Sequence, residues 1–322
     1  RRRQYGRNTR AGRRRARRRR ARKVVEGWKV VTRGGRRLVG AALMVRRASP
    51  VASLRLLLQA EQQHDPRGFR DSSGLLGQGL MDHVSCCRFF SVPSLTGRKP
   101  MQVHDPSSLL SGAGSFFLPF GNDPAYCKGR SFLRGYGLWG AINRFDPPWW
   151  LKRHPDQRLG FLIGHGEVLA SETNRVTLSD RCDQFGVPMP MISCRWRDNE
   201  KAMVTHMQGT IEECIGVAGG TPASLPDLIH LPFVEPLIRG AIAVQEDSPP
   251  PGYYIHEVGG AAMGSCEESS VVDSRNRLWR APNVLVVDGA CWPTSAWQSP
   301  TLTMMAISRR ACRLSSSAPR SV

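Results

Sequence analysis

The sequence predicts a mixed fold, part α/β and part α+β, and three observations support this prediction. Residues 283–287 form a short apolar run suited to a buried strand, and residues 299–300 suit the start of a helix. Residues 199–218 place apolar side chains at four-residue spacing, which is typical of an amphipathic helix. Strand-like runs punctuated by Pro and Gly precede that helix, at residues 161–164, 174–178 and 191–196.

Length and composition place the chain among globular proteins. Its 322 residues, 40% of them apolar, suffice for one large domain or two ordinary ones. The formal net charge of +20 is concentrated in residues 1–47, which hold 20 of the 46 basic residues and one acidic residue. The remaining residues have nearly balanced charge, so the folded body shows no basic character that would indicate a nucleic-acid partner.

We expect residues 1–47 to be a disordered Arg-rich tail, because residues 1–23 are strongly self-repelling and have no hydrophobic period. One alternative is an arm that binds nucleic acid through phosphate contacts, but only Tyr5 offers a base-stacking ring within residues 1–23. A further alternative is mistranslated or decayed sequence, since GC-rich triplets encode Arg, Gly, Ala and Val in almost any frame. Nucleic acid is therefore not the expected partner.

The nine cysteines show no C-x-x-C spacing and no paired histidine spacing, so no metal site is expected. Their odd number favours a reducing, cytoplasmic compartment over a secreted disulfide framework. No apolar run approaches about 18 residues, so no membrane span is expected. The chain does not begin with Met, which suggests a fragment.

The most informative stretch lies near the carboxy terminus, between His256 and Cys312. It resembles the ending of the glucose-methanol-choline (GMC) family of flavin-dependent alcohol and sugar oxidoreductases. The matching pieces keep one order without large gaps: His256, Gly259, Met263-Gly264, Ser270-Val271-Val272-Asp273, Asn283, Asp288-Gly289, Pro293-Thr294 and Pro300-Thr301-Leu302-Thr303. Residues 48–83 resemble a second GMC segment, in which a Leu-rich helix is followed by a Gly-rich loop and Met81-Asp82-His83.

The resemblance implies a partial FAD-binding, Rossmann-like domain interrupted by an inserted antiparallel-sheet substrate domain. We expect residues 48–83 and 256–322 to belong to the flavin domain and residues 84–255 to form the substrate domain. The family's dinucleotide fingerprint lies upstream of the segment matched by residues 48–83. The only G-x-G-x-x-G in this chain, at residues 135–140, precedes Pro147-Pro148, which would stop a helix within two turns. We therefore reject it as a fingerprint.

The resemblance also assigns roles to individual residues. His256 occupies the catalytic histidine position, and histidine has a pKa suited to removing an alcohol proton near neutral pH. Ser299 stands where the family has Asn or His, and its hydroxyl can only donate or accept a hydrogen bond. His83 and His165 lie in family-like motifs and are expected to support the site by packing. His64, His104, His154, His206 and His230 are expected at the surface.

The implied cofactor is FAD, and the implied substrate is a small alcohol or sugar. Asp288 and Gly289 would place backbone N–H groups near the ribityl-phosphate part of the cofactor. Pro300, Thr301 and Leu302 would place the start of a helix near the flavin, where a positive helix end suits an anionic reduced flavin. The leading hypothesis is an FAD-dependent oxidoreductase of CH–OH groups. The alternatives are a catalytically inactive remnant of such an enzyme and a basic nucleic-acid-binding protein.

Overall fold

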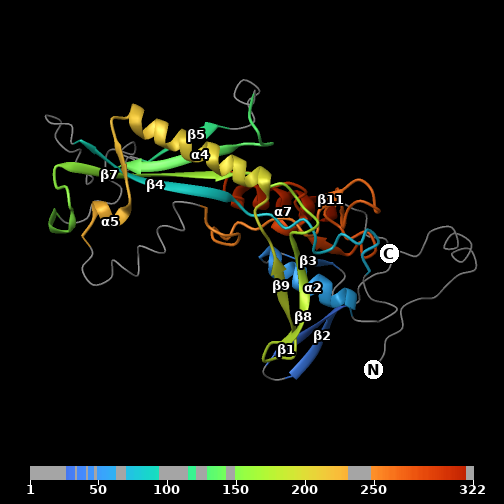
Figure 1. Ribbon diagram of the computed structural model, residues 1–322. Helices are drawn as coiled ribbons and strands as arrows, with labels where there is room; N and C mark the ends of the chain where they lie inside the picture. The colour runs from blue at the N-terminus through green and yellow to red at the C-terminus, as the bar shows by residue number, and fades with distance from the viewer. Residues whose placement is uncertain are drawn as a thin grey trace, which may run out of the picture.

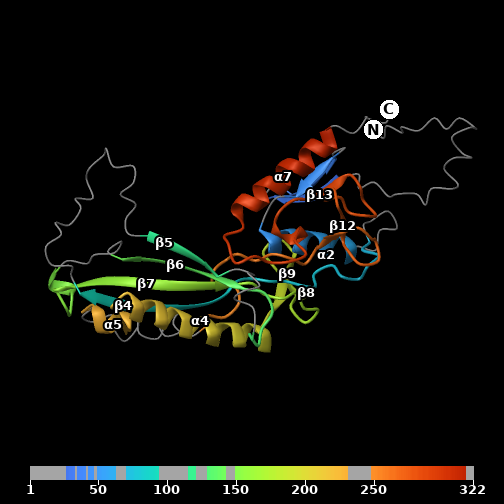
Figure 2. The same cartoon turned by 90° about the horizontal axis from the view of Figure 1, so that it is seen from above.

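The computed structural model describes residues 27–32, 35–40, 43–46, 49–62, 70–93, 115–120, 129–142, 149–230 and 248–316. Within them the fold is mixed, with antiparallel sheets, helices and two short parallel pairs of strands, β3–β13 and β11–β12. A large sheet with a long helix on one face makes up one part. In Figure 2, α7, β13, β12 and α2 gather beyond one end of that sheet.

The large sheet is antiparallel and has five strands in the order β10-β4-β7-β6-β5. These strands are β4 (Val84–Pro93), β5 (Ser115–Phe120), β6 (Tyr136–Ile142), β7 (Gln157–Gly166) and β10 (Thr221–Ala223). The predicted strand at residues 161–164 lies within β7. The segment rejected above as a dinucleotide fingerprint runs into β6, an interior antiparallel strand, and that rejection is confirmed.

Helix α4 (Asp198–Val217) lies along one face of this sheet, as Figure 1 shows, and confirms the helix predicted at residues 199–218. Its buried Met203 and Met207 pack against β7 at two glycines. A Cβ at Gly164 would lie 2.1 Å from the Met207 sulfur, and one at Gly166 would lie 2.3 Å from the Met203 sulfur. Because Gly164 and Gly166 have no side chains, Met207 and Met203 can pack closely on β7.

A second antiparallel pair, β8 (Arg175–Cys182) and β9 (Pro188–Ser193), packs on helix α2 (Pro50–Gln62). Arg55 of α2 holds the turn between the two strands. Its guanidinium donates to the Asp183 carboxylate at 2.7 Å and to the carbonyls of Pro188 and Val187 at 2.6 and 2.9 Å. The fork of Arg therefore joins residues that are about 130 positions apart in the chain.

Strand β3 (Met44–Arg46), from the segment expected to be a tail, pairs in parallel with β13 (Val284–Val286) of the expected flavin-domain segment 256–322. The predicted strand at residues 283–287 thus corresponds to β13. Helix α7 (Thr301–Ser316) covers this pair, with Ala311 buried against Leu285 and Val287. Three short elements complete the region: β11 (Met263–Gly264), β12 (Val272–Asp273) and the 3-10 turn η2 (Gly289–Cys291).

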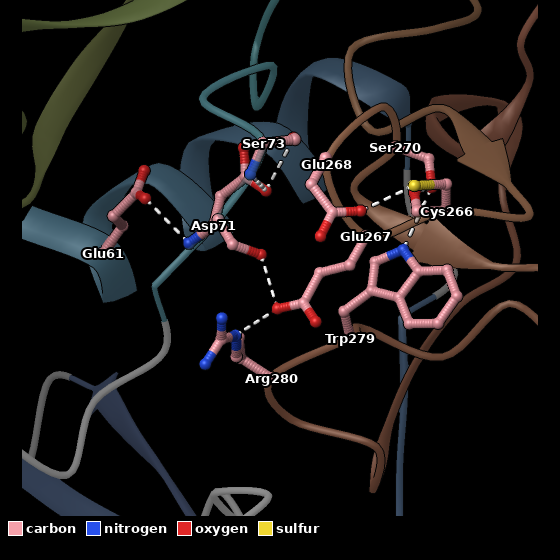
Figure 3. A network of polar contacts seen from close by, with 10 residues as sticks. Glu61, Asp71, Ser73, Cys266, Glu267, Glu268, Ser270, Trp279 and Arg280 are labelled. Carbon is pink, nitrogen blue, oxygen red and sulfur yellow. Dashed lines mark hydrogen bonds and ion pairs between the residues drawn. The ribbon is translucent and has the colours of Figure 1, made fainter. Parts of the chain in front are cut away.

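Polar contacts join the expected flavin-domain segments, residues 48–83 and residues 256–322, within the network drawn in Figure 3. Ser72 donates to the Glu267 carboxylate at 2.7 Å, and the same carboxylate pairs with Arg280. The backbone N–H of Asp71, next to Ser72, donates to Glu61 near the end of α2 at 2.9 Å. Because these contacts are partly exposed, we regard them as fixing the register of the loops more than as a large source of stability.

The expected tail does not extend through residue 47. Residues 1–26 lie outside the described residues, but β1 (Gly27–Thr32) and β2 (Gly35–Gly40) pair as an antiparallel hairpin. Strand β3 follows and is paired in parallel with β13. The high density of Arg falls after residue 23, and β13 offers a buried backbone partner to residues 44–46 in spite of Arg46. Pairing with a distant strand therefore outweighs the local basic charge.

The remaining elements are short: the 3-10 turn η1 (Trp149–Leu151) and the helix α5 (Leu225–Leu228). Across the described residues, no helix is both long and apolar enough to span a bilayer. The described cysteines form no disulfide with one another.

Ser53 provides a test of the joint between α2 and η2. This fully buried serine donates to the Asp288 carboxylate at 2.5 Å. We expect Ser53→Ala to lower the free energy of unfolding by about 1–3 kcal/mol, because a buried carboxylate loses a donor. Urea unfolding followed by circular dichroism measures the change. Ser72→Ala removes an exposed serine–carboxylate bond and is the matched control, with an expected change below about 0.5 kcal/mol. Equal losses in both variants would contradict the assignment.

Candidate active site

A buried carboxylate holds the turn that carries His256. Asp82, only 2% exposed, follows the Gly-rich loop and accepts three backbone N–H groups. These come from His83 at 2.8 Å, Gly252 at 2.7 Å and His256 at 3.3 Å. A reciprocal backbone pair between Met81 and Val258, at 2.8 and 2.9 Å, extends the same junction. The two GMC-like segments therefore meet at the predicted catalytic histidine.

The backbone just before His256 is strained. Ile255 has a φ of +57°, in the left-handed region that β-branched residues rarely adopt. Its side chain is 75% exposed, so little burial compensates for that conformation. The hydrogen bonds that Asp82 accepts on either side of Ile255 hold the turn in place. Such strain persists only where surrounding contacts determine the conformation, and it is common at functional sites.

Three imidazole rings cluster at this junction. The His83 ring stacks on His165 of β7 with centroids 5.0 Å apart, and it meets His256 edge to face with centroids 4.9 Å apart. Tyr254 packs edge to face on His165 at 4.5 Å. Several buried polar atoms here have no hydrogen-bond partner: both ring nitrogens of His83, Nε2 of His165, Nδ1 of His256, the Tyr254 hydroxyl and the Ser85 hydroxyl.

Burial keeps these groups uncharged near neutral pH. It lowers the pKa of His83 to about 3, aided by His165 and His256 and opposed by the backbone of Gly166. It also lowers the pKa of His165 to about 4, with His256 contributing. The Tyr254 pKa is raised to about 12, mainly by burial. The wall behind His256 is therefore polar but neutral.

The loop that precedes α7 is fixed to the large sheet close to His165. Ser295 exchanges hydrogen bonds with the backbone of Val168, accepting at 2.9 Å and donating at 3.0 Å. Trp297 lies over Gly137, where a Cβ would come within 2.3 Å of the indole, and Gly137 is the cross-strand partner of His165. Ser299, two residues further on, is exposed. The loop that carries residues 295–299 therefore approaches the end of β6 and β7 at which His165 lies.

Helix α7 begins at Thr301, one residue later than predicted. The Pro300 carbonyl accepts from the Met304 N–H at 2.9 Å, so Pro300 is buried at the boundary of the helix. Thr301 is exposed, and Leu302 is 79% exposed. The first turn of α7 contains no acidic residue. Its unpaired N–H groups and positive dipole end are therefore open to an anionic or electron-rich ligand.

Asp288 and Gly289 have structural contacts of their own. The Asp288 carboxylate accepts from Ser53 and from the Ala290 N–H at 2.9 Å, so it caps η2 from within the core. A Cβ at Gly289 would meet the Glu257 carbonyl and Pro50 at 3.0 Å. Gly289 is thus required for the turn to approach the chain beside His256. A contact of their backbone with a cofactor remains a prediction.

The structure brings some predicted site residues together and leaves others apart. The Gly289 carbonyl accepts from the Gly259 N–H at 2.8 Å, which joins the η2 turn to the loop after His256. Both residues are described, yet no hydrogen bond or ring contact joins the His256 and Ser299 side chains. Sequence reasoning missed Asp82 as the anchor of the turn, although its place in Met81-Asp82-His83 was the available signal.

Two other features lie outside this junction. A hollow of about 260 Å³ between α2 and β8 is lined by residues such as Leu58, Glu61 and Arg175, and by none of the predicted site residues. Among the residues that the structure describes, no group of three or more His, Cys, Asp or Glu side chains is arranged to hold a metal ion. The histidine cluster is therefore not read as a metal centre.

Residues 170–308 match the family model for GMC oxidoreductase. This range includes Ser295 and the turn that carries His256. The carboxy-terminal part of the chain therefore carries the GMC oxidoreductase domain that this family model describes. A 2-methyl-1,2-propanediol dehydrogenase of Mycolicibacterium austroafricanum is 29% identical over 292 residues, which are 86% of this chain and 48% of that protein. The fructose dehydrogenase large subunit of Gluconobacter japonicus is 24% identical over 279 residues, 85% of this chain and 47% of that protein.

The fold of this chain also matches solved structures. One is a formate oxidase from Aspergillus oryzae RIB40, in a study of FAD modification. It has a TM-score of 0.56 and 16% sequence identity, and the match covers 91% of this chain and 57% of that one. This likeness concerns the fold alone. The chain spans about half the length of the curated GMC relatives that it matches.

The neutral histidines predict acid sensitivity. The unfolded chain binds protons on His83 and His165 below their ordinary pKa of 6.5, whereas the folded chain does not until about pH 4 or lower. Stability is therefore complete above about pH 6.5 and falls as the pH drops toward 4. We expect a slope approaching about 1.4 kcal/mol per pH unit for each histidine, measured by urea unfolding between about pH 7 and 5.

His83→Gln should reduce that slope by one histidine's share. The matched control is His154→Gln, which removes an exposed imidazole and should leave the slope as in the parent. An unchanged slope in His83→Gln would show that His83 is not held neutral in the folded chain.

The strained turn gives a second prediction for this region. Ile255→Asn should raise the free energy of unfolding by about 1 kcal/mol, because Asn tolerates a positive φ far better than a β-branched residue. Ile192→Asn is the matched control, since Ile192 is 52% exposed within β9 and Asn is disfavoured in strands. Thermal unfolding of both variants measures the effect. A loss of stability in Ile255→Asn equal to that in Ile192→Asn would argue against strain at this turn.

Proposed function

We propose that this chain forms the substrate-facing, carboxy-terminal part of an FAD-dependent oxidoreductase that oxidises CH–OH groups of alcohols or sugars. The GMC oxidoreductase domain supports the reaction class. The similar dehydrogenases act, by their names, on a propanediol and on fructose. The family assignment does not by itself select dehydrogenase or oxidase chemistry, so the proposal is limited to oxidation of the CH–OH group.

The observation that carries the proposal is the setting of His256. Its backbone N–H is held by a buried carboxylate, its Nδ1 is buried, and its ring rests against a neutral imidazole. With Nδ1 inside the protein, Nε2 is the nitrogen that faces a substrate. A neutral imidazole held in this way is suited to accept the proton that leaves a substrate hydroxyl.

The described residues fit the flavin end of FAD. The first turn of α7 presents helix N–H groups without a competing acidic residue, and exposed Leu302 and Met305 offer apolar surface beside them. When bound, FAD would supply the acceptor for the hydride that leaves the substrate carbon. Pro300, Thr301 and Leu302 would contact the flavin ring, while Asp288 would act by holding η2 and the loop beside His256 in place.

Ser299 has a smaller proposed role. It is exposed at the start of α7 and has only a hydroxyl, so it would donate one hydrogen bond to the substrate oxygen and would not act as a base. A catalytically inactive remnant is the competing interpretation, because Ser299 stands at a position where the GMC family has Asn or His. Flavin absorbance and turnover of the purified protein separate the two interpretations.

The test is a substitution at His256 in a flavin-loaded enzyme that carries this sequence. His256→Ala should slow anaerobic flavin reduction by about 10² to 10⁴, the usual contribution of a positioned general base. Ser299→Asn should leave the rate unchanged or raise it. Stopped-flow absorbance with saturating alcohol measures both rates, and His154→Ala serves as the control for loss of an exposed imidazole. Reduction at the parental rate in His256→Ala would refute the assignment of His256 as the base.

We propose that residues 48–83 and 256–322 form one flavin domain around an inserted substrate domain at residues 84–255. The hydrogen bond from Ser53 to Asp288 and the one from Ser72 to Glu267 support the first part, because each joins residues 48–83 to residues 256–322. The β8–β9 hairpin of the proposed inserted segment also contacts α2.

A further inference from the structure

We propose that His83 is a positioning residue that accepts the Nδ1–H of His256 and so leaves the His256 Nε2 with the lone pair that a base needs. This inference rests on the proposed function, in which Nε2 takes the substrate proton. It assigns a chemical task to a histidine for which the sequence indicated packing or indirect support of the site.

The requirement follows from imidazole chemistry. A neutral imidazole carries one proton, and only the other nitrogen can accept one. If Nε2 of His256 is the base, Nδ1 must carry the proton in the resting state. That Nδ1 is buried, so its N–H needs an acceptor from the protein, which would fix the tautomer and the ring orientation.

His83 is placed to be that acceptor. The two rings meet at 88° with centroids 4.9 Å apart, a separation at which a nitrogen of each ring can come within hydrogen-bonding distance of about 3 Å. Both nitrogens of His83 are buried and have no partner in the structure. A rotation of the ring about χ2 exchanges nitrogen and carbon positions with little movement of its centroid, and a tilt of one ring out of the edge-to-face arrangement would direct the His256 N–H along an in-plane lone pair of His83.

The surroundings of His83 keep it neutral and oriented. Burial lowers its pKa to about 3, so it retains a lone pair at neutral pH. The backbone of Gly166 on β7 raises the pKa of the same ring against the effect of burial, as a hydrogen-bond acceptor does, and so favours an N–H on the nitrogen that faces it and a lone pair on the other. His165 covers one face of the ring at 5.0 Å.

The other polar groups at the junction are less suited to this task. Asp82, from the segment before β4, already accepts three backbone N–H groups, including that of His256 itself. Tyr254, from the same turn as His256, packs on His165 and remains protonated because burial raises its pKa to about 12. Ser85 lies on β4, and no contact joins it to the His256 ring within the described residues. Among the described residues, His83 is the ring in edge-to-face contact with the His256 ring.

The experiment is a measurement of imidazole tautomers by ¹⁵N NMR on the full chain, without flavin. At about pH 8, above the ordinary histidine pKa, long-range ¹H–¹⁵N spectra distinguish the two neutral forms. We expect His256 to carry its proton on Nδ1 and to show a scalar coupling to a His83 nitrogen across the hydrogen bond. Assignment comes from the signals lost in His256→Gln and His83→Gln.

Two variants and a control complete the test. His83→Phe keeps the ring shape but has no acceptor, so His256 should change to the Nε2–H form. His83→Gln offers a carbonyl acceptor and should keep the Nδ1–H form. His165→Phe, equally buried and stacked on the far side of His83, should leave the His256 tautomer as in the parent.

Three results would overturn the proposal: a parental His256 that is Nε2–H, a His83→Phe variant that stays Nδ1–H, or an equal change in His165→Phe. The parental spectrum decides even if a variant fails to fold. The outcome is also separable from the proposed function. Loss of flavin reduction in His256→Ala together with an Nε2–H parent would keep His256 as a catalytic residue and remove His83 from its support.

Discussion

The buried carboxylate of Asp82 is the constraint on which the site depends. A charge that is 2% exposed is stabilised only if its oxygens find donors, and three backbone N–H groups from two distant segments supply them. Those donors fix the turn that carries His256 against the end of the Gly-rich loop. Asp82 accepts the backbone N–H groups of both His83 and His256, so these two residues are held close together and their rings are in contact. The strained φ of Ile255 is the conformational cost of that arrangement.

The candidate site has two layers that differ in exposure and in the kind of group they present. The inner layer is a wall of neutral polar rings from β7, the segment before β4 and the 252–256 turn. The outer layer is the exposed first turn of α7, with Ser299, Leu302 and a helix end free of acidic residues. The inner layer consists of groups that burial keeps uncharged, and the outer layer presents a positive dipole end and apolar surface. Under the proposed function, the inner layer would act on the substrate proton and the outer layer would contact the flavin.

Local pattern predicted the elements well where side-chain periodicity or a helix start was strong. Helix α4, strand β13 and helix α7 appear within one residue or so of the predicted places, because buried methionines, an apolar run and Pro300 each determine their own segment. Strand β3 was missed because its stability comes from pairing with residues about 240 positions away, and no local signal reports that. The motif Met81-Asp82-His83 drew attention to Asp82, but its role depends on backbone donors at Gly252 and His256 that are about 170 positions away. Of the site, the sequence predicted His256 through a family motif, but the ring contacts that surround it depend on β7 and on tertiary packing.

The grip of Arg55 on the β8–β9 turn has a mechanical consequence. One guanidinium bonds a carboxylate and two carbonyls of the turn, so swinging the hairpin away from α2 would break three hydrogen bonds in a single event. If the hairpin separated only partly from α2, some of these donors would have no acceptor. We therefore expect the hairpin to stay packed on α2 for most of the time and to separate from it rarely.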